Sequence, residues 1–212
     1  SCGTRDESLG ASCGQQAGRG LTVLGVRRFA VLTSLVLLLT SLSLAPRAAD
    51  RDDEIWVLVD TRAMTVSIFA GDSVKSVYES ISIGRGGTTT DKSKDDRKTP
   101  LGEYRISRIA KQTPFHRFFG FDYPSLEQAQ RALQAGVINE RQYRSILTAF
   151  RSGEAPPQNT PLGGYLGIHG VGEGDPRIHE NFNWTNGCIA LSNEQIDDIA
   201  RWIKLGTRVV VR

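Results

Sequence analysis

Residues 168–191, IHGVGEGDPRIHENFNWTNGCIAL, place a histidine and a cysteine at the edges of two apolar runs. His169 ends the first run and is followed by Gly170, while Cys188 opens the second run directly after Gly187. An imidazole can take the proton of a thiol, and the resulting thiolate is a strong nucleophile. A glycine before the cysteine lets a substrate carbonyl approach the backbone and exposes N–H groups to a developing oxyanion. The pattern therefore predicts nucleophilic catalysis, with Cys188 as the nucleophile and His169 as the base.

The composition and length indicate one globular domain with an appendage. The chain has 212 residues, of which 39% are hydrophobic and 23% are charged, as in ordinary folded proteins. From Asp50 onward 21 Lys and Arg residues face 21 Asp and Glu residues, so the formal charge of +3 arises before that point. A charge-balanced domain gives no electrostatic reason to bind nucleic acid, and no nucleic-acid partner is expected.

The start of the chain has the pattern of an export signal. Residues 1–26 are rich in Gly, Ser and Arg and predict a disordered extension. Arg27 and Arg28 then precede the uncharged run FAVLTSLVLLLTSLSLA at 29–45. This order resembles a secretory signal, and the run is slightly short of the ~20 residues that span a bilayer. Residues 27–49 are therefore expected to be a signal sequence or a membrane anchor, which places the following domain in the periplasm or cell envelope.

The expected export determines which cysteines can pair. Cys2 and Cys13 precede the signal, so Cys188 is the one cysteine of the exported part. Exported compartments oxidise paired thiols, and an odd cysteine there indicates a reactive thiol. The alternative is a buried, inert cysteine that packs as a small hydrophobic residue.

Residues 50–212 predict a mainly β domain. Apolar or alternating runs indicate strands at 55–60, 64–69, 74–83, 103–109, 162–168 and 207–211. The first three of these strands predict an antiparallel meander. The glycine-rich and charged segment 84–98 lacks an apolar anchor and predicts a mobile surface loop.

Helical patterns interrupt the strands in two places. Residues of about 112–160 form an expected insertion, in which Ser125 can cap a helix through about Gln134 and Asn139 can cap another through about Phe150. A further helix is expected from Glu194 to about Lys204. The predicted fold is a single mainly β domain with an inserted helical hairpin and one C-terminal helix.

With these residues placed, residues 54–212 resemble the L,D-transpeptidase catalytic domain of the YkuD type. The family's histidine and Ser/Thr-x-Gly-Cys motif is matched by His169 and, after 15 intervening residues, by TNGC at 185–188. Its upstream Thr-Pro-x-Gly-x-Tyr element is matched by TPLGEY at 99–104. The resemblance implies a β-sandwich-like fold, no cofactor and no metal, and peptidoglycan peptide stems as donor and acceptor, with a wall-anchored protein as another acceptor.

The resemblance also implies a role for each matched residue. Cys188 would attack the carbonyl, His169 would serve as general base and then acid, and the backbone carbonyl of Gly170 would orient His169. The N–H groups of Gly187 and Cys188 would hold the oxyanion. Substrate-binding residues are expected at Thr185, Asn186 and Tyr104.

Two departures leave the outcome of the reaction open. Asn186 stands where the family often has histidine, and Ala190 stands where it usually has arginine. The acyl-enzyme can therefore pass to an amine, as in a transpeptidase, or to water, as in an L,D-carboxypeptidase or endopeptidase. Two other readings are a zinc site of His169, His179 and Cys188, and a non-catalytic cell-wall-binding module.

Overall fold

The structure is a computed structural model, and it describes residues 54–212. The expectations for residues 1–26 and 27–49 lie outside the described residues. Within 54–212, the helices are too short or too polar to cross a membrane.

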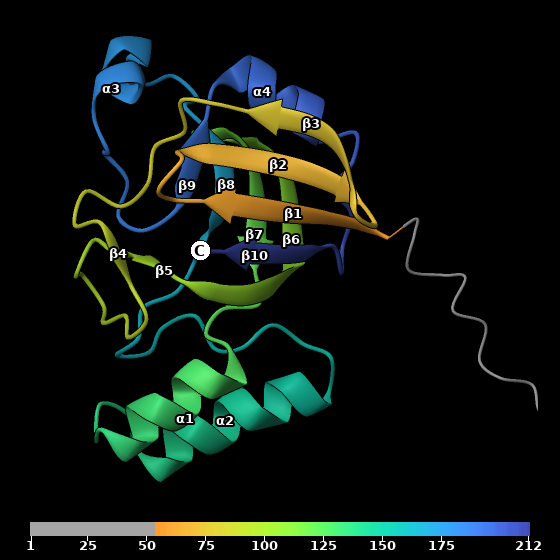
Figure 1. Cartoon of the computed structure of the whole chain (residues 1–212). Helices are drawn as coiled ribbons and strands as arrows, with labels where there is room; N and C mark the ends of the chain where they lie inside the picture. The colour runs from red at the N-terminus through yellow and green to blue at the C-terminus, as the bar shows by residue number, and fades with distance from the viewer. Residues whose placement is uncertain (1–53) are drawn as a thin grey trace, which may run out of the picture. The chain divides into compact units, whose positions relative to one another are not determined.

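An eight-stranded sheet forms the centre of the domain (Figure 1). Its order is β3-β2-β1-β10-β6-β7-β8-β9, and only the pairs β1–β10 and β8–β9 are parallel. The predicted antiparallel meander is confirmed as the first three strands. The strands are β1 (Ile55–Asp60), β2 (Thr65–Ala70), β3 (Ser73–Tyr78), β6 (Gly102–Thr113), β7 (His116–Phe121), β8 (Gly167–Gly170), β9 (Ile189–Leu191) and β10 (Arg208–Val211). A separate pair consists of β4 (Thr88–Thr89) and β5 (Thr99–Pro100).

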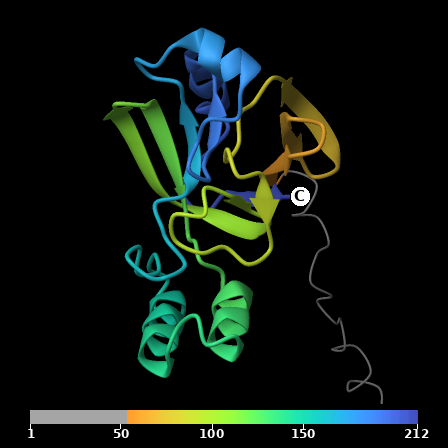
Figure 2. The ribbon, with the colours of Figure 1, turned by 90° about the vertical axis from the view of Figure 1, so that its left-hand side faces the viewer.

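The two ends of this sheet are joined. Ser82, which follows β3, exchanges backbone hydrogen bonds of 3.0 and 2.8 Å with Ala190 in β9. The sheet therefore curls, and Figure 2 shows β6 and β7 facing the meander across the interior. This is the mainly β, sandwich-like arrangement that the sequence predicts.

Alternating side chains explain how the curled sheet encloses its core. In β1, Val57 and Val59 are fully buried, and Val57 lies in register with Ile68 of β2 and Val209 of β10. Successive residues of a strand point to opposite faces, so each strand contributes every second side chain to the interior. Each fully buried aliphatic side chain of this size contributes roughly 1.5–3 kcal/mol.

Helices lie at opposite ends of the sheet (Figure 1). At one end the helical hairpin comprises α1 (Leu126–Gln134) and α2 (Glu140–Arg151), and their predicted caps, Ser125 and Asn139, both form capping boxes. At the other end are α3 (Pro176–Asn181), which the sequence does not predict, and α4 (Asn193–Ile199). The last helix ends before the predicted Lys204.

The insertion is shorter than the predicted 112–160. Residues 112–121 belong to the sheet, because β6 continues to Thr113 and β7 pairs with both β6 and β8. The dense aromatics of this stretch obscure its strand pattern, in which Phe119 and Phe121 are buried while Phe118 lies toward the site. The helical hairpin therefore begins only after Phe121.

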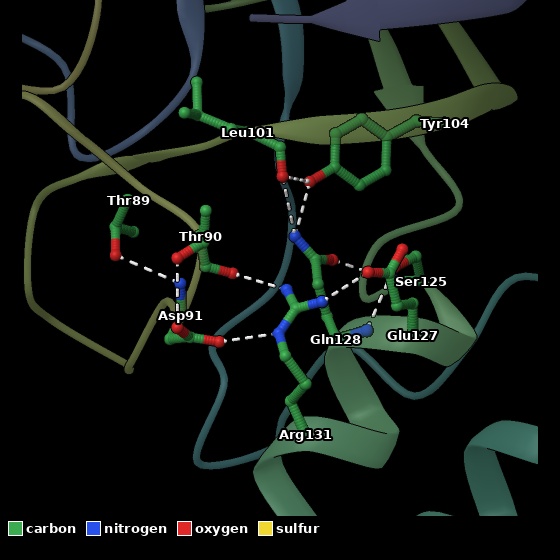
Figure 3. A network of polar contacts seen from close by, with 9 residues as sticks. All are labelled: Thr89, Thr90, Asp91, Leu101, Tyr104, Ser125, Glu127, Gln128 and Arg131. Atoms are coloured by element: carbon green, nitrogen blue, oxygen red, sulfur yellow. Dashed lines mark hydrogen bonds and ion pairs between the residues drawn. The ribbon is translucent and has the colours of Figure 1, made fainter.

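The segment 84–98 is held in place, which contradicts the expected mobile loop. Figure 3 shows helix α1 reaching it through Arg131, whose Nε donates to Asp91 at 2.8 Å and whose Nη2 donates to the Thr90 carbonyl at 2.9 Å. From the same helix, Gln128 donates to the Tyr104 hydroxyl at 2.7 Å and the Leu101 carbonyl at 3.1 Å. The helical hairpin thus braces the loop against the sheet.

Candidate active site

Neighbouring strands bring the predicted cysteine and histidine together. Strands β8 and β9 run parallel, with His169 in register with Ala190, and Cys188 immediately precedes β9. Both side chains line one cavity of about 610 Å³. His169 and Cys188 share this cavity because a crossover connection joins β8 to β9 and places the two strands next to each other.

His169 is buried and held in one tautomer. Its Nδ1 lies 2.7 Å from the backbone carbonyl of Gly170. A carbonyl can only accept a hydrogen bond, so Nδ1 carries the proton and Nε2 keeps the free lone pair. Burial lowers the pKa of His169, the bond to Gly170 opposes that shift, and His179 adds to it. The ring is therefore neutral at neutral pH, with Nε2 able to accept a proton.

Aromatic side chains surround the His169 ring. The ring centroid lies 4.5 Å from that of Phe115, 6.3 Å from that of Phe118 and 5.7 Å from that of Trp184. These apolar rings remove water from the imidazole, which accounts for the lowered pKa. The sequence assigned none of the three to the site, because aromatics near a core pattern more often pack as core.

The Cys188 thiol rests as a neutral group. Its Sγ donates to the carbonyl of Tyr165 at 3.5 Å, and among residues 54–212 it forms no hydrogen bond to His169. Burial raises the pKa of Cys188 to about 11, although a backbone hydrogen bond from Gly167 and the charge of Lys92 act in the opposite direction. Thiol and imidazole are thus both uncharged at neutral pH. This arrangement suits general-base removal of the thiol proton during attack, rather than a preformed ion pair.

The loop before Cys188 is fastened by Thr185. The Thr185 hydroxyl donates to the Cys188 carbonyl at 2.7 Å and accepts from the Gly187 N–H at 3.1 Å. These bonds occupy the Gly187 N–H and the buried Thr185 hydroxyl in the structure, and the oxyanion role of Gly187 and the substrate-binding role of Thr185 stay predictions. The φ of Gly187 is +133°, and a Cβ there would lie 2.6 Å from the Lys98 carbonyl, so the position requires glycine.

Tyr104, for which a role in substrate binding is expected, does not line the cavity that holds Cys188 and His169. Only 1% of Tyr104 is exposed, and its hydroxyl bonds to the Leu101 carbonyl and the Gln128 amide (Figure 3). Burial raises its pKa far above the ordinary value. Tyr104 is therefore part of the framework that joins β6 to α1. Asn186, in contrast, is exposed and borders the cavity, so its expected contact with substrate stays a prediction.

His179 is the third residue of the alternative zinc site, with His169 and Cys188. It is the buried residue of α3, and its Nδ1 accepts a hydrogen bond from Trp184 Nε1 at 3.4 Å. In the part of the chain that the structure describes, no three His, Cys, Asp or Glu side chains gather as a metal site. The geometry therefore gives no support to the zinc reading.

Tyr165 is a site residue that the sequence analysis missed. It adopts a φ of +55° and exposes 62% of its surface, while its carbonyl accepts a hydrogen bond from the Cys188 thiol. A non-glycine residue in this conformation is strained and is often found at functional sites. The adjacent Gly163 and Gly164 are the one signal in the sequence for such a tight segment.

Fold and site together define a class: a mainly β domain in which a cysteine and a histidine meet at neighbouring strands in an arrangement suited to acyl transfer. The family is then given by its sequence model. The chain belongs to the YkuD family, the L,D-transpeptidase catalytic domain, whose model matches residues 54–211.

Solved structures share this fold at low sequence identity. Bd1075 from Bdellovibrio bacteriovorus is 20% identical, with a TM-score of 0.50, over 78% of this chain and 50% of that chain. The helical cell shape determining protein Pgp2 from Campylobacter jejuni is 19% identical, with a TM-score of 0.50, over 77% of this chain and 51% of that chain. This chain thus spans about half the length of these two structures. No curated protein matches it in sequence.

Proposed function

We propose that this protein is an L,D-transpeptidase that acts on the peptide stems of peptidoglycan through an acyl-enzyme on Cys188. The observation that carries the proposal is the bond between His169 Nδ1 and the Gly170 carbonyl, because it leaves Nε2 as the proton acceptor of a residue that lines the same cavity as Cys188. The family supplies the substrate class. A binding module would need neither the fixed tautomer nor the thiol.

In the acylation step, Cys188 Sγ turns from the Tyr165 carbonyl, gives its proton to His169 Nε2 and attacks the scissile carbonyl carbon. The carbonyl oxygen becomes an oxyanion, for which the Cys188 N–H is the remaining backbone donor, since the Gly187 N–H is engaged by Thr185. The C–N bond then breaks, His169 returns the proton to the leaving amine, and a thioester remains.

In the second step an acceptor amine, with His169 taking its proton, attacks the thioester and releases Cys188 as a thiol. The product is a cross-link between stems or a bond to a wall-anchored protein. Water as acceptor would give an L,D-carboxypeptidase or endopeptidase instead. Ala190 favours that second candidate, because it is fully buried and places no charge where the family usually has arginine.

The setting of the reaction belongs to the same proposal. The export signal at 27–49 supports a place in the periplasm or cell envelope, with membrane attachment through 29–45 if it is retained. The fold neighbour Pgp2 is described as a cell shape determining protein, which supports a role of this chain in cell shape.

Incubation of the purified protein with isolated muropeptides, followed by mass spectrometry, tests the function. Cross-linked dimers would identify a transpeptidase and shortened stems a hydrolase. We expect Cys188→Ala to abolish both products while leaving the fold intact. Products formed equally well by Cys188→Ala, or no product from the wild type, would contradict the proposal.

A further inference from the structure

A two-residue turn of Pro114 and Phe115 joins β6 to β7 and lies beside the His169 ring. The ring centroids of Phe115 and His169 are 4.5 Å apart, and both turn residues line the cavity that holds Cys188. Phe115 is 41% exposed, whereas His169 is only 3% exposed, so the aromatic ring stands between the imidazole and solvent. The position of this turn therefore controls how much water reaches His169.

The two strands alone do not fix this turn. Their register shifts between Ala110 and Thr113, immediately before the turn, and His116, immediately after it, adopts a φ of +67°. A residue other than glycine keeps such a left-handed conformation where the surrounding structure enforces it. Contacts from outside the hairpin of β6 and β7 must therefore hold the turn.

Asp197 of α4 supplies these contacts. His116 Nε2 donates to Asp197 Oδ2 at 2.9 Å, and Arg117 Nε donates to Asp197 Oδ1. One carboxylate thus binds both residues that directly follow the turn. The hydrogen bonds from His116 and Arg117 also lower the pKa of Asp197, so the carboxylate stays charged and its bonds are charge-assisted.

The same helix holds the surface on which the turn packs. Asn193 stands four residues before Asp197, which places the two side chains on one face of α4. The Asn193 amide accepts from the Gly172 N–H at 2.8 Å and donates to the Gly172 carbonyl at 2.9 Å. A Cβ on Gly172 would lie 1.9 Å from the Pro114 carbonyl oxygen, so the turn packs directly on this segment. Helix α4 therefore fixes both sides of the contact between the turn and the chain that follows His169.

We propose that Asp197 is a positioning residue, which holds the turn of Pro114 and Phe115 against the His169 ring and so keeps water from the imidazole. This rests on the proposed function, in which a neutral His169 takes the thiol proton. Asp197 does not line the cavity of Cys188 and acts only through the turn. Loss of its carboxylate would release the turn from α4, and a better hydrated imidazole would hold a proton more tightly.

An NMR titration of the imidazole signals tests this without any substrate. The chain has three histidines, so the His169 signal can be assigned with His116→Gln and His179→Gln. We expect Asp197→Asn to raise the pKa of His169 by roughly half a unit. Loss of a negative charge would by itself lower this pKa, so a rise identifies the loss of shielding from water. An unchanged or lowered pKa would overturn the proposal.

The neighbouring acid provides a matched control. Asp198→Asn removes the same charge from the same helix, but Asp198 bonds to Tyr78 and Arg201 and not to the turn. This variant should leave the pKa of His169 unchanged or slightly lower. A rise equal to that of Asp197→Asn would overturn the proposal, because α4 as a whole and not Asp197 would then be responsible.

A double-mutant cycle tests whether Asp197 acts through Phe115. Phe115→Ala should raise the pKa of His169 on its own, because the shielding ring is removed. Addition of Asp197→Asn to this variant should then raise the pKa little further, since the two changes act on one contact. Fully additive shifts would overturn the proposal, because Asp197 would then act by a route that does not involve the ring.

The pH dependence of acylation connects the result to the proposed function. The acid limb of kcat/KM should move to higher pH in Asp197→Asn by the same amount as the NMR titration. If the wild-type protein forms no acyl-enzyme, the proposed function fails, and the NMR titration still decides whether Asp197 positions the turn.

Discussion

Raising the pH tests the resting state of the nucleophile directly. Burial raises the pKa of Cys188 from an ordinary value of 9.0 to about 11. At neutral pH that shift lowers the thiolate fraction about a hundredfold. A more basic thiolate is also more nucleophilic, with a Brønsted slope of about 0.4–0.5, which recovers close to a factor of ten. Alkylation by iodoacetamide at pH 7 should therefore be about tenfold slower than that of an ordinary thiol.

The midpoint of the pH–rate curve gives the sharper test. Limited access of iodoacetamide to the thiol lowers the alkylation rate by the same factor at every pH, so it leaves the midpoint unchanged. Mass measurement of the peptide that contains Cys188, after alkylation from pH 7 to pH 11.5, should place the midpoint close to 11, with Cys188→Ser as the control that reports labelling of Cys2 and Cys13. A midpoint at or below 9.0 would refute the reasoning, and only a midpoint far below 9.0 would indicate a preformed thiolate–imidazolium pair.

The same shift predicts a change in stability. The folded state holds the thiol proton more tightly than the unfolded state, so this contribution is complete below pH 9.0 and is lost as the pH rises through about 11. The shift corresponds to about 3 kcal/mol. Urea unfolding should therefore show the wild type losing up to that amount relative to Cys188→Ser over this interval. Parallel curves for the two proteins would contradict a raised pKa.

Three further outcomes follow from the site. Because burial lowers the pKa of His169, the acid limb of the pH–rate profile for acylation should have its midpoint below pH 6.5. A midpoint above pH 6.5 would contradict a neutral base. Gly170→Ala would bring a Cβ within 2.8 Å of the Asn193 amide oxygen, and urea unfolding should show a loss of about 1–3 kcal/mol, against about 1 kcal/mol for the open position Gly136→Ala. Thr185→Val leaves the Gly187 N–H without its acceptor and should cost about 1–3 kcal/mol of unfolding free energy, whereas Thr185→Ser should cost less; equal losses would argue against the hydroxyl as the cause.

Local patterns explain what the sequence could predict. The meander, both capped helices of the hairpin, and the closeness of His169 and Cys188 follow from strand alternation, capping chemistry and motif spacing. These signals lie within a few residues of one another, or in a motif whose spacing the family preserves. Such information survives without knowledge of the tertiary structure.

Features decided by distant contacts could not be predicted. The pattern of segment 84–98 predicts a mobile loop, but Arg131 of α1, 40 residues after Asp91, bonds to it. Tyr104 matches a position in the motif where substrate binding is expected, yet its hydroxyl accepts a hydrogen bond from Gln128. Likewise the hydroxyl of Thr185 can bind substrate or its own loop, and only the folded backbone decides between them.

The closure between Ser82 and Ala190 constrains how this chain can change over evolutionary time. Ala190 is fully buried, and its N–H and carbonyl both bond to Ser82 where the ends of the sheet meet. A long charged side chain at 190 would have to be buried or would have to part these two segments. An arginine at 190 would therefore need compensating changes around Ser82 to be accommodated in this arrangement.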